Sequence, residues 1–321
     1  MKNIVYFQAI SEAIAEEMTR DNKVFVIGED VQQGTFMETN GLVQQFGPER
    51  IIDTPISETA IAGAAVGSAM AGYRPICDMY MADFFLVAGA EIMMNAAKWS
   101  FMHAGRVKVP CVFLVSVGGG MKLAAEHSAT ITGYLMHTPG LKVVFPSNPF
   151  DMKGLLKTAI RDDGPVVVCY HKGILGMSQE IPEEEYLIAF NQADIKRQGS
   201  DVTVVAVSNM VNHALKVADE LKNTISVEVI DPRTIAPLDI ETIVASVKKT
   251  GRLVVVDEDV EVCGITAEII MQVIERAFDF LDAPPRRVAA ANMPIPGGVL
   301  EKYALPQPED IKEAIEKVFN A

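Results

Sequence analysis

Glu58 is the residue whose type and position point most clearly to chemistry. It follows a short strand-like run, Ile51–Asp53, and a break at Pro55, and it stands where the next helix is expected to begin. Ligands of open α/β sheets bind beyond the carboxyl ends of the strands, so a carboxylate here is a candidate catalytic acid. The alternative is structural, because the helix macrodipole favours an acid in the first turn.

A second candidate is His127, which lies just past three consecutive glycines, Gly118–Gly120. The glycines fit neither the dinucleotide-binding pattern nor the nucleoside triphosphate pattern. We therefore expect a flexible loop beside a site. A loop histidine can transfer protons near neutral pH, although a structural role is the alternative here as well.

The composition excludes some classes of function. The formal net charge of −14 argues against nucleic acid, which requires a basic surface. Of the 321 residues 49% are hydrophobic, yet no apolar run reaches the roughly 18 residues of a membrane span. The apolar excess instead predicts a buried subunit interface and hence an oligomer.

The four cysteines (Cys77, Cys111, Cys169 and Cys263) contain no Cys-x-x-Cys pair, which argues against zinc and dithiol sites. Buried free thiols in a reducing compartment fit this pattern. The N-terminus enters an amphipathic pattern directly, without the profile of a signal peptide. We expect the protein in the cytoplasm.

Strand-like and helix-like segments alternate through the chain and predict an α/β protein of two doubly wound domains. We place the first domain at residues 1–185 and the second at 186–321. Strands are predicted at 24–27, 51–53, 75–79, 109–115, 141–146, 165–170, 202–207, 226–230, 252–257 and 287–290. Helices are predicted at 7–19, 59–71, 84–103, 149–161, 212–222, 239–248, 266–278 and 308–319.

The helix expected after Glu58 carries a stripe of small residues. Glycine in a helix interior costs about 1 kcal/mol relative to alanine, so two of them indicate close approach of another backbone. That neighbouring helix can belong to another subunit. The stripe consists of Ala60, Gly63, Ala64, Gly67, Ser68 and Ala71.

Taken together, the motifs resemble the beta subunit of thiamine-diphosphate-dependent 2-oxo acid dehydrogenases, in the transketolase-like superfamily. The resemblance runs in order through essentially the whole chain. The run Val168–Lys172 is most similar to the beta subunit of acetoin dehydrogenase. The other matching runs are Val26–Val31, Asp53–Glu58, Ala65–Gly67, Gly72–Ile76, Ala82–Phe84, Glu126–Ser128, Thr138–Val144, Asp151–Leu156, Ala159–Val166, Asp231–Asp239 and Pro294–Pro296.

The resemblance implies a thiamine pyrimidine-binding fold followed by a transketolase C-terminal-like domain. It implies that Glu58 hydrogen-bonds a ring nitrogen of the aminopyrimidine and so activates thiamine diphosphate. Ile56, Tyr80 and Phe84 are the expected neighbours of the cofactor. His127 corresponds to the family's histidine that faces the substrate and the lipoyl arm.

The resemblance also implies partners and ions. The Gly-Asp-Gly…Asn pattern that holds Mg²⁺ and the diphosphate is absent from this sequence, so an alpha subunit should supply it in a heterotetramer of two alpha and two beta subunits. A lipoyl acyltransferase core is a further expected partner. A potassium ion, held mainly by backbone carbonyls, would involve Cys111, Ala159, Ile160, Asp162 and Gly164.

Two departures from the family pattern bear on the substrate, a small carbonyl compound. The family's His-Ser-Gln reads His127-Ser128-Ala129 here, and the glutamate of Cys-Glu-His-Lys is Tyr170. Acetoin, pyruvate, a branched-chain 2-oxo acid and another diketone all stay open. The alternatives in function are a lipoyl-independent split transketolase-type carboligase subunit and a non-catalytic beta-like scaffold.

Overall fold

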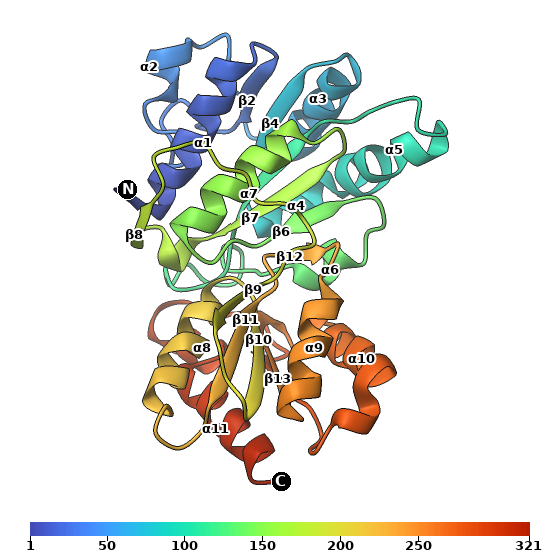
Figure 1. Ribbon diagram of the computed structural model, residues 1–321. Coiled ribbons are helices and arrows are strands. Elements are labelled where there is room, and N and C mark those ends of the chain that lie inside the picture. Colours follow the sequence, from blue (N-terminus) through green and yellow to red (C-terminus); the bar gives the residue numbers. More distant parts are fainter. The chain divides into compact units, whose positions relative to one another are not determined.

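The computed structural model describes all 321 residues, and their contacts group them into two compact units (Figure 1). The first unit holds Met1–Val117 and Tyr134–Phe190. The second holds Gly118–Gly133 and Asn191–Ala321. The segment that carries His127 therefore belongs with the second unit, although it lies within the first half of the sequence. The predicted boundary between residues 185 and 186 stays a prediction.

The first unit is built on a parallel sheet in the order β6-β7-β5-β4-β2-β3. Its strands are rich in buried Val and Ile, as expected of a sheet covered on both faces. A separate antiparallel pair joins β1 (Lys2–Val5) to β8 (Ser178–Ile181). The sheet strands are β2 (Val24–Gly28), β3 (Ile51–Asp53), β4 (Arg74–Met81), β5 (Val112–Val117), β6 (Lys142–Val144) and β7 (Val166–His171).

The helices of this unit follow the expected alternation with the strands. The helix predicted at 84–103 is present as a helical stretch over residues 82–102, although its winding changes from α-helix to 3₁₀-helix to π-helix and back. An apolar pattern does not reveal such changes in winding. The helical elements are α1 (Tyr6–Arg20), α2 (Leu42–Phe46), α3 (Glu58–Met70), α4 (Ala82–Phe85), η1 (Leu86–Ala88), η2 (Ala90–Ala96), α5 (Ala97–Met102), α7 (Pro149–Arg161) and η3 (Lys172–Ile174), and α6 (Thr132–Met136) begins within the segment assigned to the second unit.

The second unit has a sheet in the order β14-β13-β10-β11-β9, parallel except for β9. Helices α8 and α11 pack together, as do α9 and α10, and Figure 1 shows β10, β11 and β13 between these two pairs. The elements are β9 (Asp194–Arg197), β10 (Val202–Ala206), α8 (Asn209–Glu220), β11 (Val227–Asp231), β12 (Thr234–Ala236), α9 (Ile240–Thr250), β13 (Leu253–Val260), α10 (Ile265–Ala277), η4 (Phe278–Phe280), β14 (Arg286–Ala290), η5 (Gly298–Tyr303) and α11 (Pro308–Phe319).

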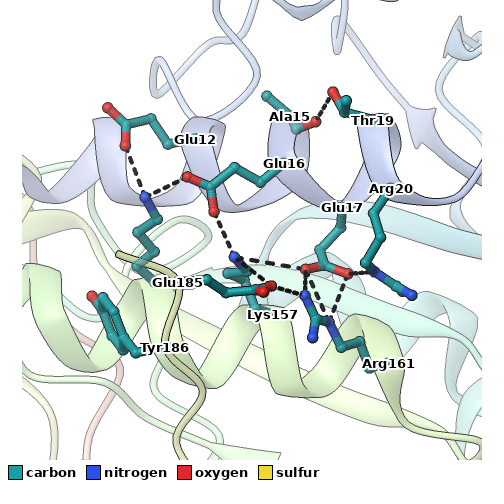
Figure 2. Close-up of polar contacts among 12 residues, drawn as sticks. Glu12, Ala15, Glu16, Glu17, Thr19, Arg20, Lys157, Arg161, Glu185 and Tyr186 are labelled. Carbon is teal, nitrogen blue, oxygen red and sulfur yellow. Dashed lines mark hydrogen bonds and ion pairs between the residues drawn. The ribbon is translucent and has the colours of Figure 1, made fainter. Parts of the chain in front are cut away.

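Helices α1 and α7 pack against each other through apolar side chains and through charged ones, and Figure 2 shows the charged contacts. Glu17 of α1 is fully buried and accepts hydrogen bonds from Arg161 of α7 and from Arg20 of its own helix. Lys157 donates to Glu16 at 2.6 Å and is almost fully buried. Buried charges are tolerated only when paired, so these pairs fix how the two helices meet.

The cysteines follow the sequence prediction in part. Cys77, Cys111 and Cys169 are buried and free, and burial raises the pKa of each thiol. Cys263 is free but exposed, so the expectation of burial was wrong for this residue. Its place just after β13 leaves it outside the sheet. None of the helices has the length and apolarity to span a bilayer.

Candidate active site

Glu58 begins α3, and the four residues 54–57 separate it from the short strand β3. The N–H of Thr54 donates to the carbonyl of Gly28 at 3.0 Å, which ties the end of β3 to the end of β2. Glu58 is half-buried. Its charge contributes to the raised pKa of Glu29, after burial and the charge of Asp30. The carboxylate of Glu58 therefore lies at the carboxyl edge of the parallel sheet, where ligands of such folds bind.

Tyr80 lies near the end of β4, the strand on the other side of β2, and Phe84 lies in α4, which follows β4 directly. The pairing of β4 with β5 shifts between Asp78 and Met81, and Tyr80 has a left-handed backbone with φ of 62°. Such irregularities are common beside active sites because they redirect a side chain. The ring of Tyr80 stacks on that of Phe84, with centroids 6.5 Å apart and planes inclined by 22°. Both side chains are half-buried.

A buried pair of carboxyl groups, which the sequence gave no reason to single out, lies behind Tyr80. Asp78 and Glu38 are each only 3% exposed, and they hydrogen-bond to each other. Burial is the main cause of the raised pKa of both groups, and the charge of Glu38 raises that of Asp78 further. Two carboxyl groups in such contact share a proton.

Tyr170, one of the two departures from the family pattern, is fully buried at the end of β7. Burial raises the pKa of its hydroxyl. Its ring packs edge to face with the ring of Phe36, with centroids 6.3 Å apart. The ring of Phe36 in turn packs against that of Tyr80, with centroids 5.6 Å apart. One ring, that of Phe36, therefore lies between Tyr170 and Tyr80, a residue expected to neighbour the cofactor.

His127 lies in the segment 118–133, which belongs to the second unit, and it is half-buried. Its backbone N–H donates to the carbonyl of Ala124, a residue with a left-handed φ of 70°. The first unit thus holds Ile56 and Glu58 just beyond β3, and it holds Tyr80 and Phe84 at and just beyond the end of β4, with β2 between these two strands. His127 belongs to the second unit. Ile56 is 71% exposed within this single chain.

Two of the five residues expected to hold potassium already contact a positive group. Arg74 Nη1 donates to the carbonyl of Ile160 at 3.1 Å and to that of Asp162 at 2.8 Å. The Asp162 carboxylate is paired with Lys142. These carbonyls converge on a cationic group, as a potassium site requires, but the chain supplies that charge itself.

Two surface pockets lie away from these residues. One of about 350 Å³ lies beside β14 and α11, and one of about 580 Å³ is lined by Asp21, Arg74 and Lys108, among others. Neither includes any of the predicted site residues.

Comparison with known proteins decides the family. Residues 2–177 match "Transketolase, pyrimidine binding domain" and residues 191–311 match "Transketolase, C-terminal domain". The chain is 48% identical over 315 residues to the pyruvate dehydrogenase E1 component subunit beta of Rickettsia felis, with 97% of each chain covered. The chain belongs to the E1 beta-subunit family. The predicted fold and the predicted family of thiamine-diphosphate-dependent beta subunits are confirmed.

Other E1 beta subunits are similar over nearly the same length. The mitochondrial pyruvate dehydrogenase E1 beta subunit of Rattus norvegicus is 46% identical, covering 98% of this chain and 90% of the relative. The beta subunit of acetoin:2,6-dichlorophenolindophenol oxidoreductase from Cupriavidus necator is 42% identical, covering 97% and 96%. Of these three relatives, the acetoin enzyme has the lowest identity to this chain. Overall identity therefore does not support the expected closer similarity to acetoin dehydrogenase.

A solved structure shares the fold of this E1 beta subunit. It is described as "Split gene transketolase, inactive beta4 tetramer" and superposes with a TM-score of 0.79 at 23% identity, over 99% of this chain and 98% of that one. At this identity the match speaks for the fold alone.

Proposed function

We propose that this chain is the catalytic beta subunit of a dehydrogenase that cleaves the bond next to the carbonyl of pyruvate and passes the acyl group to lipoyl. The observation that carries the proposal is the half-buried carboxylate of Glu58 at the sheet edge that also presents the stacked Tyr80 and Phe84. An acid and an aromatic platform suit an aminopyrimidine ring, which has nitrogens to hydrogen-bond and a face to stack.

In this proposal Glu58 hydrogen-bonds the ring nitrogen of the aminopyrimidine. Ile56, Tyr80 and Phe84 flank the ring, and His127 faces the substrate and exchanges protons with it. Thiamine diphosphate, when bound, supplies the carbon nucleophile and the electron sink. The chain's part is to orient the ring and to hold the carboxylate of Glu58 against it.

An alpha subunit is proposed to supply Mg²⁺ and the diphosphate half of the site, within a heterotetramer. Support comes from the exposed face of α3, where Ala60, Ala64 and Gly67 are open to solvent. A Cβ added to Gly67 would meet nothing within 4 Å, so no neighbour in this chain requires a glycine there. Large apolar side chains are exposed in the helices that α3 packs against and just beyond them, namely Leu86, Val87, Met94, Phe101 and Met102.

Acetoin is the second candidate substrate. It is favoured by the run Cys169–Lys172, which resembles the Cys-Glu-His-Lys run of acetoin dehydrogenase beta subunits except that Tyr170 replaces the glutamate. Because Tyr170 reaches Tyr80 only through Phe36, we expect it to tune the site rather than to contact the substrate. Turnover of the purified complex on pyruvate and on acetoin separates the two.

Potassium binding at Cys111, Ala159, Ile160, Asp162 and Gly164 is a further proposal. A bound ion would raise the unfolding temperature in potassium chloride relative to tetramethylammonium chloride at equal ionic strength. Equal unfolding temperatures would leave Arg74 as the cation at these carbonyls.

The decisive experiment purifies the tagged chain with its native partner and compares Glu58→Gln with the wild type. We expect thiamine-dependent turnover to fall at least about a hundredfold, because loss of a proton-transfer group typically has this effect. The exposed Glu49 gives a matched control, Glu49→Gln, which should keep full turnover. Unchanged turnover in Glu58→Gln would favour the scaffold, and product formation without lipoyl would favour the carboligase.

A further inference from the structure

Three consecutive acids at the end of β13, namely Asp257, Glu258 and Asp259, are all buried. We call them the three-acid cluster. Neighbouring residues of a strand point to opposite faces, yet all three side chains bind the segment 118–133, which carries His127. Burial of three acids is expensive, so contacts with this segment must offset it.

The cluster holds the segment at both ends. At its start, the N–H of Gly119 donates to Glu258 Oε1 at 2.6 Å. At its other end, the N–H of Gly133 donates to Asp259 Oδ2 at 3.0 Å. His127 lies between these two attachments.

The contacts of Thr132 require a proton on the cluster. Its hydroxyl oxygen lies 2.5 Å from Asp257 Oδ2 and 3.0 Å from Asp259 Oδ2, but a hydroxyl has one hydrogen to donate. One of the two carboxyl groups must therefore be protonated and donate to Thr132. Asp259 accepts two backbone N–H groups, from Gly133 and Val260, whereas Asp257 accepts one, from Glu258. The ionised form is therefore favoured more at Asp259, and the proton belongs on Asp257.

The electrostatics agree with this assignment. Burial raises the pKa of Asp257 to about 7, and the charges of Asp259 and Glu258 on the same strand raise it too. Burial raises the pKa of Asp259 as well, but the N–H groups of Gly133 and Val260 lower it. From the segment, Thr132 and Gly133 contribute a hydroxyl and an amide donor. Asp257 thus changes charge near neutral pH.

The rest of the segment has little freedom to compensate. Lys122 and Ala124 have left-handed φ values of 63° and 70°, which are strained for residues with side chains. The N–H of Lys122 donates to Glu301 at 3.2 Å. A side chain at Gly119 would collide with Leu305. Loss of the attachment at Thr132 should therefore release strain and displace His127.

We propose that the three-acid cluster consists of positioning residues that hold the His127 segment through a proton shared between Asp257 and Thr132, and that ionisation of Asp257 loosens this segment. The consequence for catalysis rests on the proposed role of His127. The attachment itself does not.

The test measures hydrogen exchange of residues 118–133 in the purified complex at pH 6 and pH 8, corrected for the intrinsic pH dependence of exchange. In the wild type we expect protection to fall about tenfold between the two pH values, as Asp257 changes from mostly protonated to mostly ionised. Asp257→Asn keeps a neutral donor toward Thr132, so in this variant residues 118–133 should stay protected at both pH values. Thr132→Val should exchange fast at both, and Thr132→Ser should restore the wild-type profile.

A matched control is Glu261→Gln, which neutralises an exposed acid just beyond the same strand and should leave the profile unchanged. The proposal is overturned if Asp257→Asn keeps the pH dependence of the wild type, or if Thr132→Val is as protected as the wild type. Full turnover in His127→Ala with the expected exchange profiles would refute the proposed role of His127 and leave the attachment standing.

Discussion

The backbone N–H of Tyr80 donates to the carboxylate of Asp78, two residues earlier in the chain, at 2.8 Å. This bond closes the irregular end of β4 and holds Tyr80 in its left-handed conformation. The carboxylate that makes it is buried and is itself held by Glu38. Asp78 thereby fixes the direction of the ring that stacks on Phe84.

Replacement of Asp78 by alanine should weaken binding of thiamine diphosphate by the complex about tenfold. The reason is the loss of one hydrogen bond of about 1.5 kcal/mol, which frees Tyr80 to leave a strained conformation. Asp78→Asn retains an acceptor oxygen and should bind nearly as the wild type. Titration of the apo complex with the cofactor measures both, and equal dissociation constants for Asp78→Ala and wild type would show that Asp78 does not position Tyr80.

The pair of Asp78 and Glu38 should also make the stability of the first unit depend on pH. Both pKa values are raised above the ordinary 3.8 and 4.5, so the folded state binds protons more tightly than the unfolded state does. Stability from this pair is fully present below about pH 4 and is lost as pH rises through the raised values. Between pH 5 and pH 8, the free energy of unfolding in urea should fall less steeply with pH for Asp78→Asn than for the wild type. Parallel curves would contradict the shared proton.

Several elements followed directly from local sequence signals. The bounds of α7 were predicted as 149–161 because Asn148 caps the helix, accepting the N–H of Asp151 at 2.9 Å, and Pro149 takes the first helical position. The strand Ile51–Asp53 was likewise predicted with its bounds. The short strands β1, β8 and β9 were missed because they contain several polar residues and at most one buried residue each, so no apolar run marks them.

The site was less accessible to prediction than the fold. Sequence and resemblance singled out Glu58 and Phe84, and the structure puts both at the expected edge of the sheet. The carboxyl pair of Glu38 and Asp78 was not foreseen, because its partners are 40 residues apart and neither matches a motif. The same holds for the three-acid cluster, whose contacts with Thr132 span 125 residues or more.

The exposed thiol gives a direct check on the second unit. In the native isolated chain, a thiol reagent such as dithionitrobenzoate should react rapidly with Cys263 alone, since the other three thiols are buried. Burial also raises the pKa of Cys77 and Cys169, so the reactive thiolate form is scarce there. Unfolding in guanidinium should release all four. Cys263→Ser should abolish the rapid phase, and rapid reaction of a second thiol in that variant would contradict the burial of the strands.

Glu17 should be among the most sensitive positions for stability in the first unit. It is fully buried, and Arg161 donates to it from both Nε and Nη2, at 3.0 Å and 2.7 Å (Figure 2). Glu17→Ala would leave the Arg161 guanidinium without its main partner and should lower the free energy of unfolding by about 3 kcal/mol. The effect lies at the low end for buried pairs because Arg161 is partly exposed and also binds Glu185. Lys108→Ala removes an exposed pair with Asp163 in the same unit and should change stability by less than about 1 kcal/mol. Urea unfolding compares the two variants, and equal losses would mean that the contacts between α1 and α7 do not depend on this buried charge.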